Sequence, residues 1–144
     1  MKHFVMIMGL PGSGKTTYGK NNYPDYYHCE ADDWFYDDKV RAYVFNPAEL
    51  KNAHKYCQQA FSRAIESGIN VVVSNTFLRA WERKFYLELA KSAGYKITVV
   101  DCRDQWGNIH GVSFNKLEEM AQKWEELTSE ELNKYVIEHI IIQS

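Results

Sequence analysis

The sequence is poor in cysteine, in proline and in long apolar runs, and each shortage narrows the class of protein. Its 144 residues include only three cysteines, widely separated and without a C-x-x-C pair, at positions 29, 57 and 102. This spacing excludes a disulfide-rich scaffold, does not support a zinc site, and predicts a reduced intracellular protein with structural thiols. No stretch approaches the roughly 20 apolar residues of a membrane span, so we expect no membrane partner.

Charge and length set further limits. The formal net charge is −2, so a global basic field for nucleic acid is absent and any nucleic-acid contact has to be local. The three prolines lie at positions 11, 24 and 47, and no linker, repeat or low-complexity tract interrupts the chain. We expect one domain over residues 1–144, and a cytoplasmic location because the N-terminal apolar run leads into a motif. No feature of the sequence specifies an oligomeric state.

One stretch carries a recognisable chemical pattern. Residues 9–16 read G-L-P-G-S-G-K-T, which fits G-x-x-x-x-G-K-[ST], the Walker A phosphate-binding loop. The apolar residues 4–8 before it are typical of a buried strand, and residues 15–22 after it indicate a helix. The alternative, a glycine-rich hairpin with an unrelated lysine, is disfavoured because four spaced constraints are met and both flanking elements fit.

The residue types explain how such a loop binds phosphate. Gly12 and Gly14 can adopt backbone angles closed to other residues, so that successive N–H groups point inward around anionic oxygens. Lys15 places an ammonium on the β and γ phosphates, and Thr16 offers a hydroxyl ligand for Mg²⁺. No guanine-specifying N-K-x-D motif occurs, which favours ATP. The predicted nucleotide-contacting residues are Leu10, Pro11, Gly12, Ser13, Gly14, Lys15, Thr16 and Thr17.

Apolar runs alternate with helical periodicity along the rest of the chain. We expect strands over residues 4–8, 26–29, 69–73, 96–102 and 136–142, and helices over residues 15–22, 46–67, 79–93, 114–127 and from 129. Residues 31–45 follow no clear pattern. The alternation predicts an α/β fold in three αβα layers, in which helices cover both faces of a mostly parallel five-stranded sheet.

Polar residues stand at the ends of these strands, where ligands gather in open parallel sheets. Asp32 and Asp33 follow the second strand. One carboxylate can accept the proton of an attacking hydroxyl and the other, Asp33, can hold Mg²⁺, whereas the competing interpretation is a helix cap. Asn75 and Thr76 can contact the substrate or the γ-phosphate, or simply form a turn and a helix cap. We expect these residues and Arg103 to meet the phosphate loop in one cleft.

Other residues have competing interpretations. Arg79 and Arg83, four apart on one helix face, can bind a phosphate of the acceptor, but a solvated helix face is slightly preferred. His54 lies on the apolar side of its helix and receives no role, whereas His110 lies in a glycine-flanked loop. Five aromatic residues near the aspartates can stack on a nucleobase or cover the sheet edge: Trp34, Phe35, Tyr36, Tyr43 and Phe45.

The chain resembles the small, AAA_33-like P-loop kinases related to the kinase domain of phage polynucleotide 5′-hydroxyl kinase. The similarity rests on G-L-P-G-S-G-K-T at 9–16, A-D-D-W-F at 31–35, A-H-K-Y-C at 53–57, S-N-T at 74–76, A-W-E at 80–82 and G-N-I-H-G-V at 107–112. The resemblance implies a P-loop NTPase fold with the kinase-like strand order 2-3-1-4-5. It also implies ATP-dependent phosphorylation of a hydroxyl, with Asp32 as the general base and Lys15 and Thr16 in their phosphate and Mg²⁺ roles.

Three positions depart from the family pattern. Phe35 stands where the family has an arginine for the substrate phosphate, and Asn75 stands where it has an aspartate. The lid segment 103–110 is short, and Arg103, its only arginine, is expected to supply the lid charge. The acceptor is left open between a polynucleotide 5′-hydroxyl, a nucleoside and another small molecule. The alternative function is an ATP-binding switch or adaptor protein with weak ATPase activity.

Overall fold

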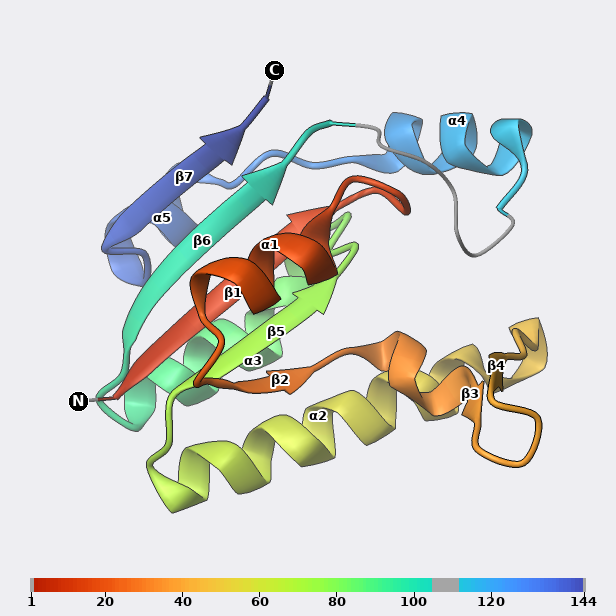
Figure 1. The fold of residues 1–144 in the computed structure, drawn as a ribbon. Coiled ribbons are helices and arrows are strands. Elements are labelled where there is room, and N and C mark those ends of the chain that lie inside the picture. The colour runs from red at the N-terminus through yellow and green to blue at the C-terminus, as the bar shows by residue number, and fades with distance from the viewer. Residues whose placement is uncertain (1, 105–111, 144) are drawn as a thin grey trace.

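A five-stranded parallel sheet forms the centre of the computed structural model, which describes residues 2–104 and 112–143. Its order is β2-β5-β1-β6-β7, visible in Figure 1. Met6 in the central strand lies level with Val73 on one side and Val99 on the other. When only the five strands of this sheet are numbered along the chain, β5, β6 and β7 become strands 3, 4 and 5, and the order is the predicted 2-3-1-4-5. The strand bounds are β1 His3–Gly9, β2 Tyr27–Cys29, β5 Val71–Asn75, β6 Lys96–Cys102 and β7 Glu138–Ile142.

Helices cover both faces of the sheet, so the predicted three layers are confirmed. Helix α1 (Lys15–Asn22) lies on one face, and α2 (Leu50–Ser67), α3 (Ala80–Ser92) and α5 (Ser129–Lys134) lie on the other (Figure 1). Gly19 lets α1 approach the sheet closely, because a Cβ at this position would lie 3.1 Å from Ile7 Cδ1. In the described residues no helix is long and apolar enough to cross a membrane.

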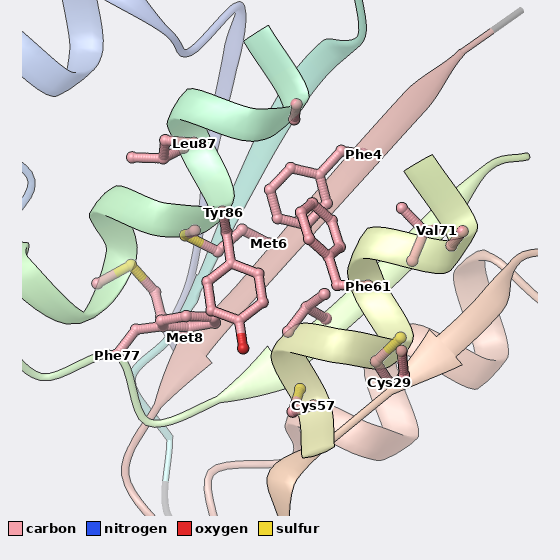
Figure 2. Packing of buried hydrophobic residues seen from close by; sticks show 14 of the residues in the cluster. Phe4, Met6, Met8, Cys29, Cys57, Phe61, Val71, Phe77, Tyr86 and Leu87 are labelled. Atoms are coloured by element: carbon pink, nitrogen blue, oxygen red, sulfur yellow. The ribbon is translucent and has the colours of Figure 1, made fainter. Parts of the chain in front are cut away.

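The main core lies between the sheet and helices α2 and α3 (Figure 2). Phe4 of β1 contacts Phe61 of α2 with ring centroids 4.8 Å apart, and Phe61 contacts Tyr86 of α3 at 4.9 Å. Every residue of β1 from Phe4 to Met8 is fully buried, as expected for a parallel strand covered on both faces. The three cysteines are free and buried, in line with their predicted structural role.

The segment without a clear sequence pattern forms a small substructure beyond the end of β2. It consists of the 3₁₀ helix η1 (Ala31–Phe35) and an antiparallel pair, β3 (Tyr36–Asp37) with β4 (Ala42–Tyr43). The predicted helix start at Asn46 is confirmed, since its Oδ1 accepts the Ala48 N–H at 3.1 Å. The first turn is a separate 3₁₀ helix, η2 (Pro47–Glu49), directly before α2.

Helix α4 (Phe114–Lys123) is shorter than the predicted helix over 114–127. The chain leaves the helix after Lys123 because the backbone of residues 125 and 126 is bonded elsewhere. The Glu125 N–H donates to Leu78 O at 2.6 Å, and Arg83 Nη1 and Nη2 donate to the carbonyls of Glu125 and Glu126. No residue of α4 is buried. The helix lies beyond the carboxyl ends of the strands (Figure 1).

Candidate active site

The phosphate loop connects β1 to α1 in the conformation that anion binding requires. Gly12 and Gly14 have φ angles of 82° and 88°, in the left-handed region that glycine adopts without strain. Gly9 is packed tightly, because a Cβ here would collide with Ser13 and lie 2.6 Å from the Cys102 carbonyl oxygen. Helix α1 follows directly, with Gly14 as its N-cap. Its unpaired N–H groups and positive dipole end therefore face the loop.

The loop opens on a cleft of about 920 Å³. Most of the residues predicted to contact the nucleotide line this cleft: Pro11, Gly12, Gly14, Lys15, Thr16 and Thr17. Leu10 and Ser13 shape the loop instead. The Leu10 carbonyl accepts the Ser13 N–H at 3.1 Å and the Lys15 ammonium at 3.1 Å, and the Ser13 side chain is buried.

Lys15 lies between the loop and two carboxylates. Burial lowers the pKa of Lys15, and the nearby charges of Asp32 and Glu30 oppose this shift. Both carboxylates line the same cleft. The predicted convergence of the phosphate loop with the end of the second strand is therefore present in the structure.

Glu30 is one residue of this site that the sequence patterns did not reveal. Its Oε1 and Oε2 accept a hydrogen bond from Thr16 Oγ1 at 2.8 and 2.9 Å. Burial raises the pKa of Glu30, partly offset by the Thr16 hydrogen bond. The available sequence signal is the position of Glu30 immediately after β2, but the nearby Asp32-Asp33 pair offers the more obvious carboxylates.

Asp32 and Asp33 have different surroundings. Asp32 lines the cleft, and its Oδ1 accepts a hydrogen bond from the Tyr43 hydroxyl at 3.3 Å. Asp33 is not among the lining residues of the cleft. Burial raises the pKa of Asp33. Glu30 is the carboxylate of this segment that accepts a hydrogen bond from Thr16, and the assignment of Asp33 to Mg²⁺ stays a prediction.

Asn75 and Thr76 lie at the cleft, but Asn75 is occupied by internal bonds. Asn75 Oδ1 accepts the Ala31 N–H at 2.9 Å, and its Nδ2 donates to Cys57 Sγ at 3.5 Å. The amide therefore joins the end of β5 to η1 and α2. The Thr76 carbonyl accepts the Gly9 N–H at 3.3 Å. The Asn75 amide therefore does not cap the helix that follows, α3, whose N-cap is Arg79. Substrate contact by Asn75 and Thr76 stays a prediction.

An aromatic wall lines part of the same cleft. Tyr43 and Phe45 are stacked with an interplanar angle of 10° and ring centroids 6.3 Å apart, and Phe35 packs edge-on against Tyr43 at 5.9 Å. Pro47, Leu50 and His54 continue this lining. Phe35 is 5% exposed, so it both supports the wall and borders the cleft. His54, to which the sequence assigned no role, is one of the lining residues.

The three arginines considered for the substrate side form ion pairs or hydrogen bonds with other parts of the protein. Arg103 Nη2 lies 2.7 Å from both Asp101 Oδ2 and Glu126 Oε2, and Arg79 pairs with Glu125 at 3.5 Å. Neither lines the cleft. Arg83, predicted on a solvated or phosphate-binding face, is instead fully buried. The burial of Arg83 contradicts both of its predicted surroundings, and Arg103 does not meet the phosphate loop in the cleft as expected. The Arg79 side chain is partly exposed, in line with the preferred solvated face, and its contact with an acceptor stays a prediction.

Lysines of α4 take the position expected of Arg103. Lys116, Met120 and Lys123 line the cleft at helical spacing, next to Ser113 and Val112 at the start of the helix. Ser113 caps α4 by accepting the Lys116 N–H at 3.2 Å. The 107–112 motif, including His110, lies outside the described residues except for Val112.

Comparison with known proteins places this architecture in a family. The AAA_33 profile, described as an AAA domain, matches residues 4–133. Human NEDD4-binding protein 2 is 32% identical over 139 residues, an alignment that covers 87% of this chain and 8% of that protein. The chain therefore spans less than a tenth of the length of this relative.

Solved structures share the fold at low sequence identity. Kti12 from Chaetomium thermophilum, in complex with ADP-AlF3, matches with a TM-score of 0.66 at 16% identity, over 96% of this chain and 88% of that one. A sugar kinase from Janibacter sp. matches with a TM-score of 0.62 at 16% identity, over 99% of this chain and 85% of that one. A gluconokinase from Sinorhizobium meliloti matches with a TM-score of 0.56 at 15% identity, over 98% of this chain and 82% of that one. Since the family profile covers nearly the whole chain and these structures repeat its sheet, the protein belongs to the AAA_33 family of P-loop kinase-like domains.

Proposed function

We propose that the protein is an ATP-dependent kinase that transfers the γ-phosphoryl group to a hydroxyl. One observation carries the proposal: Asp32 lines the same cleft as the phosphate loop and lies close enough to Lys15 to oppose the lowering of its pKa. A carboxylate beside the donor phosphates can take the proton of an acceptor hydroxyl. A protein that only binds nucleotide does not require a base at this position.

The residues of the chain divide the work between positioning and charge. The N–H groups of Gly12 and of residues 14–16, at the start of α1, hold the phosphates, and Lys15 neutralises their oxygens. Asp32 accepts the proton as the acceptor oxygen attacks in line, and the Tyr43 hydroxyl orients the Asp32 carboxylate. Thr16 and Glu30 present oxygen atoms of the kind that Mg²⁺ prefers. When bound, Mg²⁺ neutralises charge that develops on the phosphates.

The aromatic wall restricts the acceptor. Tyr43, Phe45 and Phe35 line the same cleft as the loop, and stacking on such rings contributes about 1–3 kcal/mol per base in proteins that bind single strands. We propose an acceptor hydroxyl carried by a molecule with a planar or apolar body, such as a nucleoside or a nucleic-acid end.

An acceptor screen tests the function. The protein is incubated with γ-labelled ATP and Mg²⁺ and with 5′-hydroxyl DNA and RNA, nucleosides, sugars and simple alcohols, and both labelled product and ADP are measured. We expect one acceptor class to raise ADP release far above the rate with water. ADP release that no acceptor raises would favour the alternative, a nucleotide-binding switch or adaptor with weak ATPase activity.

Replacing both cleft lysines of α4 is expected to slow phosphoryl transfer. In Lys116→Ala/Lys123→Ala the rate should fall roughly 10–100-fold, because cations that reach the transferring group stabilise the transition state. Turnover and ATP affinity are measured separately. Lys91→Ala, which removes an exposed charge from the far end of α3, serves as the matched control. If Arg103→Ala abolishes transfer while the double variant does not change it, the lid charge comes from Arg103.

A further inference from the structure

The magnesium site of this chain lacks a carboxylate at the usual place. In P-loop NTPases the ion is held by the hydroxyl residue of the loop and by an acidic residue at the end of a strand. Here β5, which pairs with the loop-bearing strand β1, ends in Ser74 and Asn75, and Thr76 follows it. The other neighbour of β1, β6, carries Asp101, but that carboxylate is 2.7 Å from Arg103 and does not line the cleft.

Glu30, the residue directly after β2, lies beside the hydroxyl of the loop residue Thr16. Both of its carboxylate oxygens lie within hydrogen-bond distance of Thr16 Oγ1, at 2.8 and 2.9 Å. Thr16 has a single O–H to donate, so its oxygen lone pairs stay available when Glu30 accepts that hydrogen bond. A metal ion could therefore bind the hydroxyl oxygen without competing for the hydrogen bond.

The sheet determines the position of Glu30. Cys29 pairs with Val73 as the last residue of β2, and the N–H of Ala31, the residue after Glu30, is held by Asn75 Oδ1 at 2.9 Å. The backbone on both sides of Glu30 is thus bonded to β5. A side chain whose backbone is anchored in this way is pre-organised for its ligand.

Resting on the proposed kinase function, we infer that Glu30 is the carboxylate of the magnesium site. It orients the Thr16 hydroxyl and supplies negative charge beside the ion. Asp32 and Asp33 are the competing carboxylates of the same segment. The Asp32 carboxylate accepts a hydrogen bond from the Tyr43 hydroxyl, and Asp33 lies outside the cleft lining.

The test is the Mg²⁺ dependence of nucleotide binding in Glu30→Gln. The variant keeps the side-chain length and an oxygen for the Thr16 hydrogen bond but loses the charge. ATP affinity is measured by calorimetry across a Mg²⁺ titration, and Mn²⁺ bound with ATP is followed by electron paramagnetic resonance. We expect the Mg²⁺ midpoint to rise on the order of 10-fold, the size seen when a supporting ligand of a metal site is lost. ATP binding in EDTA should be unchanged or tighter.

Two further variants and a melting curve separate the outcomes. Asp33→Asn tests the competing carboxylate, and Glu66→Gln, exposed near the end of α2, is the distant control; thermal melting without nucleotide confirms folding of each protein. An unchanged Mg²⁺ midpoint in Glu30→Gln, or a shifted one in Asp33→Asn alone, overturns the Glu30 assignment and leaves the proposed function standing. A wild-type protein that binds no nucleotide overturns both.

Discussion

Replacing Asp32 with asparagine is expected to lower phosphoryl transfer by about 10²–10⁴-fold, the usual contribution of general acid–base catalysis. Asparagine preserves the shape of the side chain and can still accept the Tyr43 hydrogen bond seen at 3.3 Å, but it cannot take a proton from the acceptor. Single-turnover transfer from labelled ATP measures the effect. ATP affinity, measured by calorimetry, should stay within about twofold of the wild-type value because the phosphate loop is untouched.

The neighbouring aspartate provides the matched control. Asp33→Asn makes the same chemical change one residue away, at a side chain that does not line the cleft, and it should leave the transfer rate close to that of the wild type. Normal turnover in Asp32→Asn would show that another group, or water, takes the proton. A loss in both variants would indicate that the charge of η1 as a whole, rather than one base, supports transfer.

Replacing Arg83 with alanine is expected to reduce the free energy of unfolding by about 3–5 kcal/mol, the usual cost of removing one partner of a buried ion pair. The guanidinium is fully buried, with Nε 2.8 Å from Glu131 Oε2 and Nη2 2.9 Å from Glu131 Oε1. It also donates to the carbonyls of Phe77, Glu125 and Glu126. The substitution leaves the Glu131 charge and three carbonyls without this donor. Urea unfolding measures the change.

Two comparisons identify the ion pair as the cause. Lys84→Ala, one residue away with a side chain 70% exposed, should change stability by no more than about 0.5 kcal/mol.

Burial tends to raise the pKa of Glu131, but the hydrogen bonds from Arg83 and Thr128 outweigh it and hold the pKa below its ordinary value of 4.5. A depressed carboxyl pKa contributes stability that is complete above pH 4.5 and is lost as pH falls through the folded value. Arg83→Ala should lose this acid-range dependence; a loss of stability below 1 kcal/mol would contradict the argument.

The phosphate loop and the sheet could be predicted because their signals are local. The loop needs positive φ at Gly12 and Gly14 and a run of N–H groups within eight residues. The strands appear as short apolar runs separated by helical periodicity. The end of α4 was misjudged because residues 124–127 keep an apolar pattern, while their backbone is bonded to Leu78 and Arg83 in another part of the chain.

In the candidate site too, the residues recognised by local patterns could be predicted, and those whose role depends on a distant partner could not. Lys15 and Thr16 were assigned from the motif, and Asp32 from its place after a strand together with the family resemblance; all three line the cleft. Glu30 was missed because its role depends on Thr16, 14 residues earlier in the chain. Arg103 was expected at the cleft, but Asp101 and Glu126 pair with it.

By itself the sequence determined the location of the phosphate loop, the alternation of strands and helices, and the side of the sheet on which ligands gather. The tertiary structure decided which partner each polar side chain takes. Arg83 meets Glu131 across 48 residues, and Asn75 meets Ala31 across 44. The physical reason is that backbone conformation and burial periodicity depend on neighbouring residues, whereas the pairing of a charge depends on which distant group the packed layers bring within about 3 Å.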